Sequence, residues 1–433
     1  MLEIQKELFS DDPDLILRDD FVSEDVEQFG VDGDAIVRSV RTRGGKWIPS
    51  SIRRIPDPAS RDLAEEFDLA WLRSAVKPIA SCRRGTVRVA DLFSGCGGMS
   101  VGIDEAGRAL GLKVEHVLAC DIVERNLEVY RRNFSPHLSD NRPVEELVDA
   151  PLGAALSSAE RDLKEQLGHI DLVVGGPPCQ GHSDLNNHTR REDPKNALFE
   201  RMARFAAVVE PTHIIIENVP GVRHDKARVF DRTVSALTKL GYSVDAWKLP
   251  AERVGVAQRR HRTVVVGSVA APVGDGFLRR MVSQYTRPPR PVGWALADLL
   301  DLESEHPIDT ATVQSKVSQE RIDWLFDNDE YDLPDELRPD CHRTKNHTYK
   351  SVYGRLYWDQ PAWTITTGFP VMGQGRFLHP LRRRGLTPRE AARLQFFPDF
   401  FDFGIQNRKG YAQMIGNAVP GKLAYVLGLE LLR

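Results

Sequence analysis

The sequence predicts an α/β fold with a mostly parallel, doubly wound sheet and a smaller loop-rich domain. Continuous apolar runs of strand length occupy residues 86–93, 111–121, 169–176, 212–219 and 262–268. Segments with helical spacing of apolar residues alternate with them, at 99–110, 123–134, 154–167, 197–210 and 229–240. This alternation indicates a parallel sheet with helices on both faces. Because the strands are apolar throughout, we expect both faces of the sheet to be buried.

Charge and the limits of the strand–helix alternation divide the 433-residue chain into four expected segments. Residues 1–85 form an N-terminal extension of unknown role, with twelve acidic side chains against two basic ones over 1–34 and only basic ones over 38–54. The favoured interpretation is a solvated, loosely packed extension, and the alternative is an accessory arm that contacts a polyanion. Residues 86–270 form the α/β domain, 271–384 the smaller domain, and 385–433 a C-terminal segment that returns to the α/β domain.

The smaller domain contains two blocks of opposite charge. Residues 298–340 hold fourteen acidic side chains against three basic ones, whereas 341–384 hold eight basic side chains against one acidic one. Glycines and aromatic residues lie among these bases. The pattern predicts a loop-rich domain with one cationic surface.

Composition excludes several classes of protein. No apolar run approaches the ~20 residues that span a bilayer, and the N-terminus lacks a signal-peptide pattern. The five cysteines are odd in number and widely spaced, without a CxxC motif. They argue against a disulfide framework or a zinc site and for a reducing compartment. We therefore expect a cytoplasmic protein without a metal centre.

The segment VADLFSGCGG (89–98) has the character of a ligand-binding turn. A strand ends near Asp91, and Gly95, Gly97 and Gly98 let a ligand approach the backbone at the start of a helix. The next strand ends at Asp121, where an acid can bind the hydroxyls of a ribose. The pair indicates a nucleoside-containing cofactor, either a dinucleotide or S-adenosylmethionine. A tight packing turn is the alternative.

The segment GGPPCQGHS (175–183) follows a predicted strand, so it lies at the carboxyl end of the sheet, where α/β proteins build their sites. Pro177 and Pro178 restrict the backbone ahead of Cys179. A buried cysteine that packs as a small hydrophobe is the alternative, but the polar residues after Cys179 favour a functional loop.

Two further polar groups lie at strand ends. Glu217, in ENV (217–219), is either a catalytic acid or an ion-paired glutamate. Gln258, Arg260 and Arg262 alternate in QRRHR (258–262) and share one strand face. They are donors for a phosphate or a base edge, or simply a basic strand edge.

Six motifs appear in one order: DLFSGCGG, GGPPCQ, ENV, QRRHR, LTPREAARLQFFPD (386–399) and QMIGNAVP (413–420). Together they resemble the bacterial DNA cytosine-5 methyltransferases, over residues 86 to 433. YGRLYWDQPAWTITT (353–367) and GQGRFLHP (373–380) resemble the end of that family's target-recognition region. The resemblance implies a Rossmann-like, S-adenosylmethionine-dependent methyltransferase domain over 86–270 and a target-recognition domain over 271–384. It implies transfer of a methyl group to carbon 5 of a flipped-out cytosine in a specific duplex DNA sequence.

The resemblance also implies roles for individual residues. Cys179 is the nucleophile that adds to carbon 6, Glu217 protonates ring nitrogen 3, and Arg260 and Arg262 surround the cytosine carbonyl. Pro177 directs its backbone at the exocyclic amine. The residues expected at the cofactor are Asp91, Phe93, Ser94, Gly95, Cys96, Gly97, Gly98, Asp121, Ile122, Pro177, Asn417 and Ala418. The residues expected at DNA are Gln180, Ser183, Gln258, Arg355, Ile365, Thr367 and Arg376.

Some positions carry weaker or structural expectations. The family more often has glutamate where this chain has Asp121. Glu146 and Asp149 are the candidates for an acid near the adenine amine on the third strand. Thr387, Arg389 and Glu390 are expected to form a helix cap and a structural ion pair.

The expected partner is double-stranded DNA. We expect the protein to be a monomer in the cytoplasm, associated with the nucleoid through DNA. A restriction endonuclease encoded separately is a candidate partner, and the expected roles are restriction-modification, phage defence or epigenetic marking. A tRNA cytosine-5 methyltransferase is one alternative, although the long segment between QRRHR and LTPREA favours DNA. A non-catalytic DNA-binding member is another, which retention of the cysteine and of the glycine turn disfavours.

Overall fold

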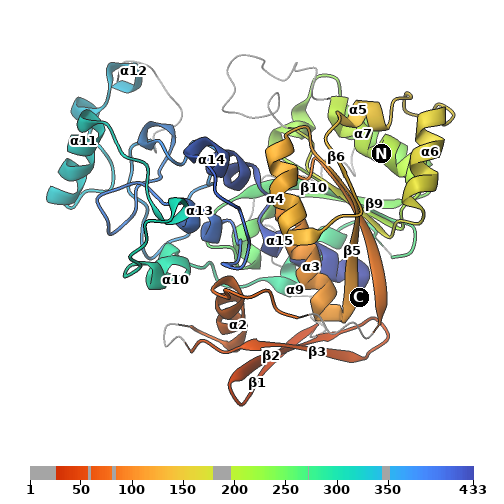
Figure 1. Ribbon diagram of the computed structural model, residues 1–433, viewed down its shortest axis with the longest axis horizontal. Coiled ribbons are helices and arrows are strands. Elements are labelled where there is room, and N and C mark those ends of the chain that lie inside the picture. The colour runs from red at the N-terminus through yellow and green to blue at the C-terminus, as the bar shows by residue number, and fades with distance from the viewer. Residues whose placement is uncertain (1–25, 57–59, 80–83, 179–196, 272, 344–351) are drawn as a thin grey trace.

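A seven-stranded sheet forms the centre of the computed structural model, which describes residues 26–56, 60–79, 84–178, 197–271, 273–343 and 352–433 (Figure 1). Its strand order is β6-β5-β4-β7-β8-β10-β9, and β10 runs antiparallel to both of its neighbours. The strands are β4 (Gly85–Leu92), β5 (Leu112–Cys120), β6 (Leu138–Asp140), β7 (Leu172–Gly175), β8 (His213–Asn218), β9 (Ser243–Pro250) and β10 (His261–Ser268). The prediction of a mostly parallel α/β sheet is confirmed, although β6 and β9 were absent from it.

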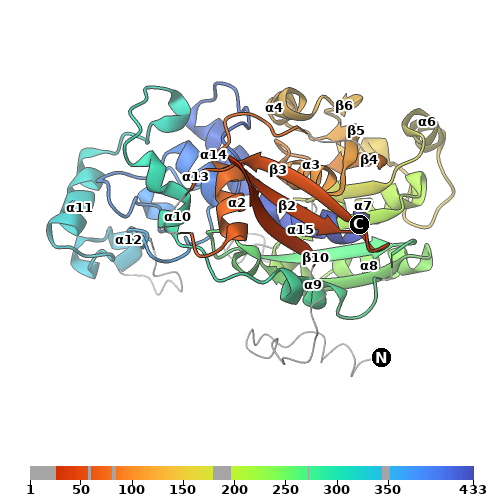
Figure 2. The same ribbon diagram turned by 90° about the horizontal axis from the view of Figure 1, so that it is seen from below.

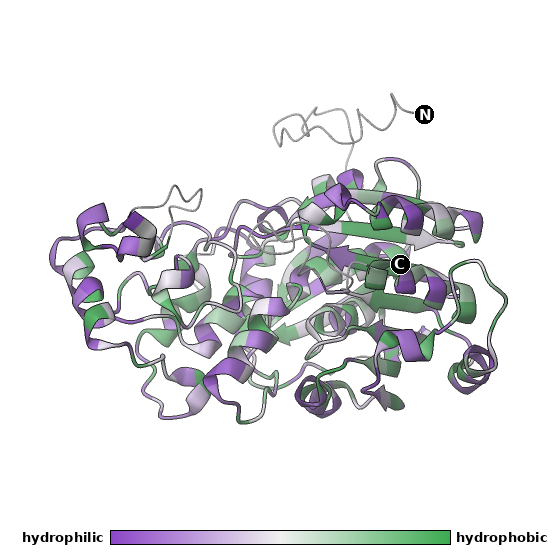
Figure 3. Ribbon diagram, turned by 90° about the horizontal axis from the view of Figure 1, so that it is seen from above, coloured by the Kyte–Doolittle hydropathy of each residue, from purple (hydrophilic) through white to green (hydrophobic). Residues whose placement is uncertain are grey.

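Helices cover both faces of this sheet, with one hydrophobic core on each face. Adjacent residues of β4 face opposite cores, Val89 one and Ala90 the other, as the strand period of two requires. Figure 3 shows apolar strands between helices with polar outer sides. The helices are α3 (Gly98–Leu110), α4 (Glu124–Phe134), α5 (Val144–Leu147), α6 (Ser158–Leu167), α7 (Leu198–Val209), α8 (Val229–Lys239) and α9 (Phe277–Tyr285). Helix α6 begins later than expected because Ser157 and Glu160 form a capping box at its start.

Residues 26–56 and 60–79, here called the N-terminal module, form an antiparallel sheet and a helix. The sheet comprises β1 (Glu27–Asp32), β2 (Ala35–Arg41) and β3 (Trp47–Arg53), and α2 spans Leu63–Leu72. Ile36, Arg38 and Val40 of β2 are buried in alternation. Figure 2 shows the small sheet lying across α3 and α15 (Gly421–Leu432). The favoured prediction of a loosely packed extension is therefore wrong for this module, because every second side chain of β2 is buried despite the charge of the segment.

The second domain is rich in loops around a small core. Its helices are α10 (Val292–Leu296), α11 (Lys316–Asp327) and α12 (Asp340–Arg343). The core gathers side chains distant in sequence, among them Ile322, Leu333, Val352 and Leu378. Short 3₁₀ helices occur across the chain at Pro220–His224, Ala251–Val254, Ala297–Leu299, Pro307–Asp309, Asp335–Leu337 and Met372–Gln374.

The two charged blocks of this domain neutralise one another. Five of the described arginines of 341–384 form ion pairs with carboxylates: Arg343 with Asp340, Arg355 with Asp329, Arg376 with Asp332, Arg383 with Asp327, and Arg384 with Glu390. The sixth, Arg382, donates to the carbonyl oxygen of Leu300. Four of these five carboxylates belong to the acidic block. The prediction of one cationic surface is wrong for the described residues, because a charge count along the chain does not show which charges meet.

The C-terminal segment contains α13 (Pro388–Leu394), α14 (Arg408–Asn417) and α15. Thr387 and Glu390 form a capping box, and Arg389 pairs with Asp309, so the prediction of a helix cap and an ion pair is confirmed. Helix α15 packs along α3 so closely that a side chain at Gly102 would meet the carbonyl oxygen of Gly421 at 2.1 Å. In the described part of the chain, every helix is too short or too polar to cross a membrane.

Candidate active site

The turn after β4 brings an open backbone beside the carboxylate of Asp121. Phe93 and Gly95 adopt left-handed conformations, with φ of 54° and 53°. A side chain at position 95 would meet no atom within 4 Å. Asp121 accepts hydrogen bonds from the amide of Gly95 at 2.9 Å and from that of Val123 at 2.9 Å. Ile122, beside it, is 63% exposed, so the turn offers both a polar and an apolar contact to a ligand.

The other two glycines of the turn are required by packing. A side chain at Gly97 would meet the ring of Phe134 at 2.2 Å, and one at Gly98 would meet the carbonyl oxygen of Val419 at 2.9 Å. Gly98 therefore lets the start of α3 contact the segment that precedes α15. Asn417 of that segment is exposed, whereas Ala418 and Ser94 are buried.

Asp91 and Cys96 point into the protein. Asp91 is 1% exposed and accepts a hydrogen bond from the Ser100 hydroxyl at 2.7 Å, and that hydroxyl lies 2.7 Å from the Tyr130 hydroxyl. Cys96 is buried, with its sulfur 3.8 Å from the carbonyl oxygen of Met414. The prediction that these two residues contact the cofactor is wrong for their side chains, which support the turn from behind.

Asp91→Asn should make the stability of the protein less sensitive to pH. Burial raises the pKa of Asp91 to about 7, from an ordinary value of 3.8. Between these values the folded chain keeps a proton that the unfolded chain releases, so the free energy of unfolding falls as pH rises from about 4 to about 7. The variant has no such proton and should gain about 2–4 kcal/mol over wild type between pH 4 and pH 8. Chemical denaturation at both pH values measures this gain, and an equal difference at the two would contradict it.

Glu217 and Arg262 meet at the end of β7. The register pairs Gly175 with Ile216, and a side chain at Gly176 would lie 3.3 Å from Oε2 of Glu217. Nε of Arg262 lies 2.6 Å from Oε1 of Glu217, and both side chains are nearly buried. The structure thus brings together two of the residues expected to act on the base, next to the strand that leads to Cys179. Cys179, Gln180 and Ser183 lie outside the described residues.

Asn218 was missed by the sequence analysis and holds the start of the cysteine loop. Its Nδ2 donates to the carbonyl oxygen of Pro177 at 3.2 Å, and its Oδ1 accepts from the amide of Val219 at 2.8 Å. Pro177 is buried, and its carbonyl is thereby engaged within the protein. The signal was present in the ENV motif, where an amide follows the acid at the end of a strand.

The buried thiols among the described residues do not suit nucleophilic chemistry. Burial raises the pKa of the Cys120 thiol to about 12 and raises that of Cys96 as well. A thiolate is the reactive form of cysteine. Both residues therefore remain protonated at neutral pH.

Arg260 and Gln258 join distant segments behind the site. Arg260 is 2% exposed and donates to the carbonyl oxygens of Ile365 at 2.7 Å, Gly416 at 3.1 Å and Ala418 at 3.0 Å. Gln258 is fully buried and accepts from the amide of Ile365 at 2.8 Å. Gln258 does not reach the surface, so the prediction that it contacts DNA is wrong in this geometry. The catalytic role of Arg260 stays a prediction.

Comparison with known proteins identifies the family. A model of the family "C-5 cytosine-specific DNA methylase" matches residues 87–433. This chain belongs to that family. It is 45% identical over 412 residues to the Type II methyltransferase M1.BsuMI of Bacillus subtilis, covering 95% of this chain and 96% of the relative. It is 29% identical to M1.HphI of Haemophilus parahaemolyticus, covering 79% and 86%.

Solved structures share the fold of the methylase. A putative DNA modification methyltransferase encoded within an Escherichia coli prophage superposes with a TM-score of 0.55 at 24% identity, over 80% of this chain and 98% of that one. The alignment with the Bacillus protein leaves only about 5% of the methylase unmatched. It therefore extends into the residues that precede the family match, where the N-terminal module lies.

Three of the residues expected at DNA lie in the interior of the methylase's second domain. Arg355 donates to the carbonyl oxygen of Pro380 at 2.8 Å, Arg376 donates to that of Arg355 at 2.7 Å, and Ile365 is fully buried. The guanidinium of Arg355 also lies 4.0 Å from the ring centre of Phe326. The prediction that they contact DNA is wrong, because these arginines cross-link the domain. Thr367 is exposed, as a DNA contact must be.

The acid at the end of the third strand is Asp140. It is the last residue of β6, and the amide of Asp121 donates to its carbonyl oxygen at 3.2 Å. Arg142 binds its carboxylate at 2.7 Å. Glu146 lies on α5, and Asp149 accepts from the Ser157 hydroxyl at 2.6 Å. Both earlier candidates are therefore wrong for a strand-end acid, because the three-residue β6 leaves too short a pattern in the sequence.

Proposed function

We propose that this methylase transfers a methyl group from S-adenosylmethionine to carbon 5 of a flipped-out cytosine, within a specific sequence of duplex DNA. The observation that carries the proposal is the Glu217–Arg262 pair, 2.6 Å apart, beside the end of the strand that leads to Cys179. A carboxyl group so placed, next to Gly176, suits a contact with the edge of a cytosine ring.

In the proposed reaction, the Cys179 thiolate adds to carbon 6 of cytosine. Glu217 delivers a proton to ring nitrogen 3, so the electrons displaced by the new carbon–sulfur bond gather at carbon 5 rather than as charge on the ring. When bound, S-adenosylmethionine supplies an electrophilic methyl group. A base then removes the carbon 5 proton, and the electrons of that carbon–hydrogen bond expel the thiolate. The proton on nitrogen 3 returns to Glu217, which restores the ring. Arg262 holds the Glu217 carboxylate in place and faces the same ring edge.

The residues around Gly95 fit the proposed cofactor. Asp121 presents a carboxylate at the end of β5, the place at which such folds bind ribose. Ile122 is exposed beside it and offers an apolar surface to an adenine ring. Asp140 is the neighbouring strand-end acid, and Asn417 is exposed at the start of the segment that precedes α15. A side chain at Gly95 would meet no atom within 4 Å, so the turn is open at this position.

A covalent trap tests the proposal. Duplex DNA with 5-fluorocytosine carries no removable proton at carbon 5, so the wild-type enzyme with S-adenosylmethionine should form a stable adduct with it. Cys179→Ala should form none, and Cys120→Ala should form as much as wild type because that thiol is buried and protonated. An adduct on Cys179→Ala, or methyl transfer by that variant, would exclude the mechanism. Binding of DNA without turnover by wild type would favour the non-catalytic alternative.

Duplex DNA is the substrate favoured by the family description, and tRNA is the alternative. Equal concentrations of unlabelled duplex DNA and tRNA, each competing with labelled DNA, should separate them. We expect only the duplex to reduce labelling. Preferential methylation of tRNA would reverse the assignment.

We further propose a cytoplasmic monomer that protects host DNA beside a separately encoded restriction endonuclease. The relatives named Type II methyltransferases support this setting, and phage defence or epigenetic marking are the related alternatives. Light scattering should give about the chain mass of 48.7 kDa. Bisulfite sequencing after expression in a methylation-free host should show methylation at one recurring sequence.

A further inference from the structure

The N-terminal module contacts the two helices whose first turns border the proposed cofactor site. Helix α3 begins at Gly98, at the end of the glycine turn, and α15 begins directly after the segment from Asn417 to Pro420. The start of α3 contacts this segment, since a side chain at Gly98 would meet the carbonyl oxygen of Val419 at 2.9 Å. A displacement of either helix therefore changes the cofactor turn.

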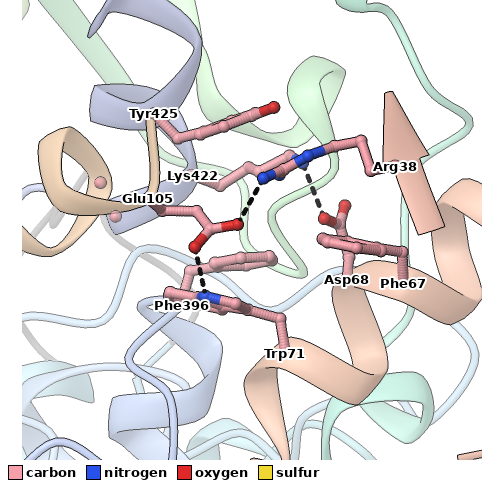
Figure 4. Close-up of a pocket in the computed structure, with 10 residues that line it drawn as sticks. Arg38, Phe67, Asp68, Trp71, Glu105, Phe396, Lys422 and Tyr425 are labelled. Carbon is pink, nitrogen blue, oxygen red and sulfur yellow. Dashed lines mark hydrogen bonds and ion pairs between the residues drawn. The ribbon is translucent and has the colours of Figure 1, made fainter. Parts of the chain in front are cut away.

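Asp68 of α2 binds a lysine in the first turn of α15. Nζ of Lys422 lies 2.8 Å from Oδ1 of Asp68, and Nη2 of Arg290 lies 2.6 Å from Oδ2 (Figure 4 shows the lysine contact). Lys422 is buried, and the start of a helix carries a partial positive charge that disfavours a cation. The Asp68 carboxylate offsets both costs, so the first turn of α15 depends on the module for its charge balance.

The module also binds α3. Glu105 of α3 accepts from Arg38 of β2 at 2.8 Å and from the indole of Trp71 at 3.0 Å (Figure 4). The aromatic rings of Phe67 and Tyr425 enclose the Arg38 guanidinium, at 4.6 and 5.0 Å from their centres. The space left between these side chains is about 10 Å³, enough for about one water molecule. The module is therefore tightly packed against the two helices.

We propose that Asp68 is a positioning residue for cofactor binding, which acts through Lys422 on the segment from Asn417 to Pro420. The inference rests on the proposed function, since it takes that segment as part of the cofactor site. It goes beyond the shared features of the family, whose match begins at residue 87, after the module. The 95% coverage by the Bacillus relative indicates that this relative has a counterpart of the module.

The test uses Asp68→Asn in the full chain. The side-chain oxygen of asparagine can still accept from Arg290, while its amide NH₂ faces the Lys422 ammonium. Lys422 therefore loses the carboxylate that neutralised it. We expect the dissociation constant for S-adenosylhomocysteine, measured by titration calorimetry, to rise about tenfold, which corresponds to about 1.4 kcal/mol. The KM for DNA should change less than twofold. The double variant Asp68→Asn/Lys422→Met should bind within threefold of wild type, because it removes the Lys422 charge, while Arg290 keeps the side-chain oxygen at position 68 and the carbonyl oxygen of Gly255 as acceptors.

Glu160→Gln provides the matched control. Glu160 binds Arg204 at 2.8 Å between α6 and α7, in an equally buried ion pair on the other face of the sheet. It should lose stability but keep its affinity for S-adenosylhomocysteine. Equal weakening in Glu160→Gln and Asp68→Asn would overturn the proposal in favour of a general loss of stability. If Asp68→Asn does not fold, the double variant is compared with Lys422→Met alone. A tenfold difference between their dissociation constants for S-adenosylhomocysteine would overturn the proposal.

The same titration separates the two proposals. Wild type that binds S-adenosylhomocysteine, with Asp68→Asn binding equally well, overturns the role of Asp68 and leaves the proposed function intact. Wild type that binds no S-adenosylhomocysteine overturns both.

Discussion

Glu217→Gln should slow methyl transfer by about 10²–10⁴-fold, the contribution typical of a positioned general acid. Glutamine preserves the shape of the side chain but has no proton to deliver to ring nitrogen 3. It also removes the anion that binds Arg262 at 2.6 Å. Single-turnover transfer of labelled methyl groups to duplex DNA measures the rate. The affinity for S-adenosylhomocysteine should remain within about threefold, since Glu217 lies on β8, and β4 and β7 separate this strand from β5, after which Asp121 follows.

Glu160→Gln is the control for this experiment as well. It removes a buried carboxylate from an arginine in the same manner, but on α6, away from the carboxyl end of β8. It should retain the wild-type rate at a temperature at which both variants are folded. A rate for Glu217→Gln within tenfold of wild type would mean that nitrogen 3 is not protonated by this residue.

Arg260→Met should be among the most destabilising substitutions in the chain. The guanidinium donates to three buried backbone carbonyls, of Ile365, Gly416 and Ala418, and methionine leaves all of them without this donor. Each buried acceptor left unsatisfied costs about 1–3 kcal/mol. The Ala418 carbonyl keeps a second donor, Nε2 of Gln395 at 3.3 Å. Since the surrounding segments can also relax, we expect a total loss of about 4 kcal/mol in the free energy of unfolding, measured by guanidinium denaturation.

Arg201→Met offers a comparison on α7. Arg201 is half-buried and donates to the carbonyl oxygens of Val148 at 3.0 Å and Ala150 at 2.9 Å, and water can replace it there. The expected loss is about 1 kcal/mol. If Arg260→Met cost no more than Arg201→Met, the carbonyls behind the site would have other donors. Arg260 would then not be the residue that holds the 365 and 416–418 segments together.

Sequence reasoning succeeded where a signal is local. The apolar runs predicted five of the seven strands of the main sheet, and the spacing of apolar residues predicted the helices from α3 to α8, apart from the four-residue α5. Glu217 and Arg262 were recognised as polar groups at strand ends, and parallel or neighbouring strand ends meet at one edge of a sheet. The capping box at Thr387 could be predicted because its two partners, Thr387 and Glu390, are three residues apart in the sequence.

By itself, the sequence determined the α/β class, the order of the motifs and the polar groups at the strand ends, because periodicity and short motifs are properties of neighbouring residues. Only the tertiary structure determined which charged side chains pair with one another. Arg260 and Arg355 became interior donors to backbone carbonyls, the acidic and basic blocks of the second domain neutralised one another, and Asp68 met Lys422 from 354 positions away. A charge is buried only when a partner offsets its loss of hydration. That partner is chosen by the packing of distant segments, which no local pattern records.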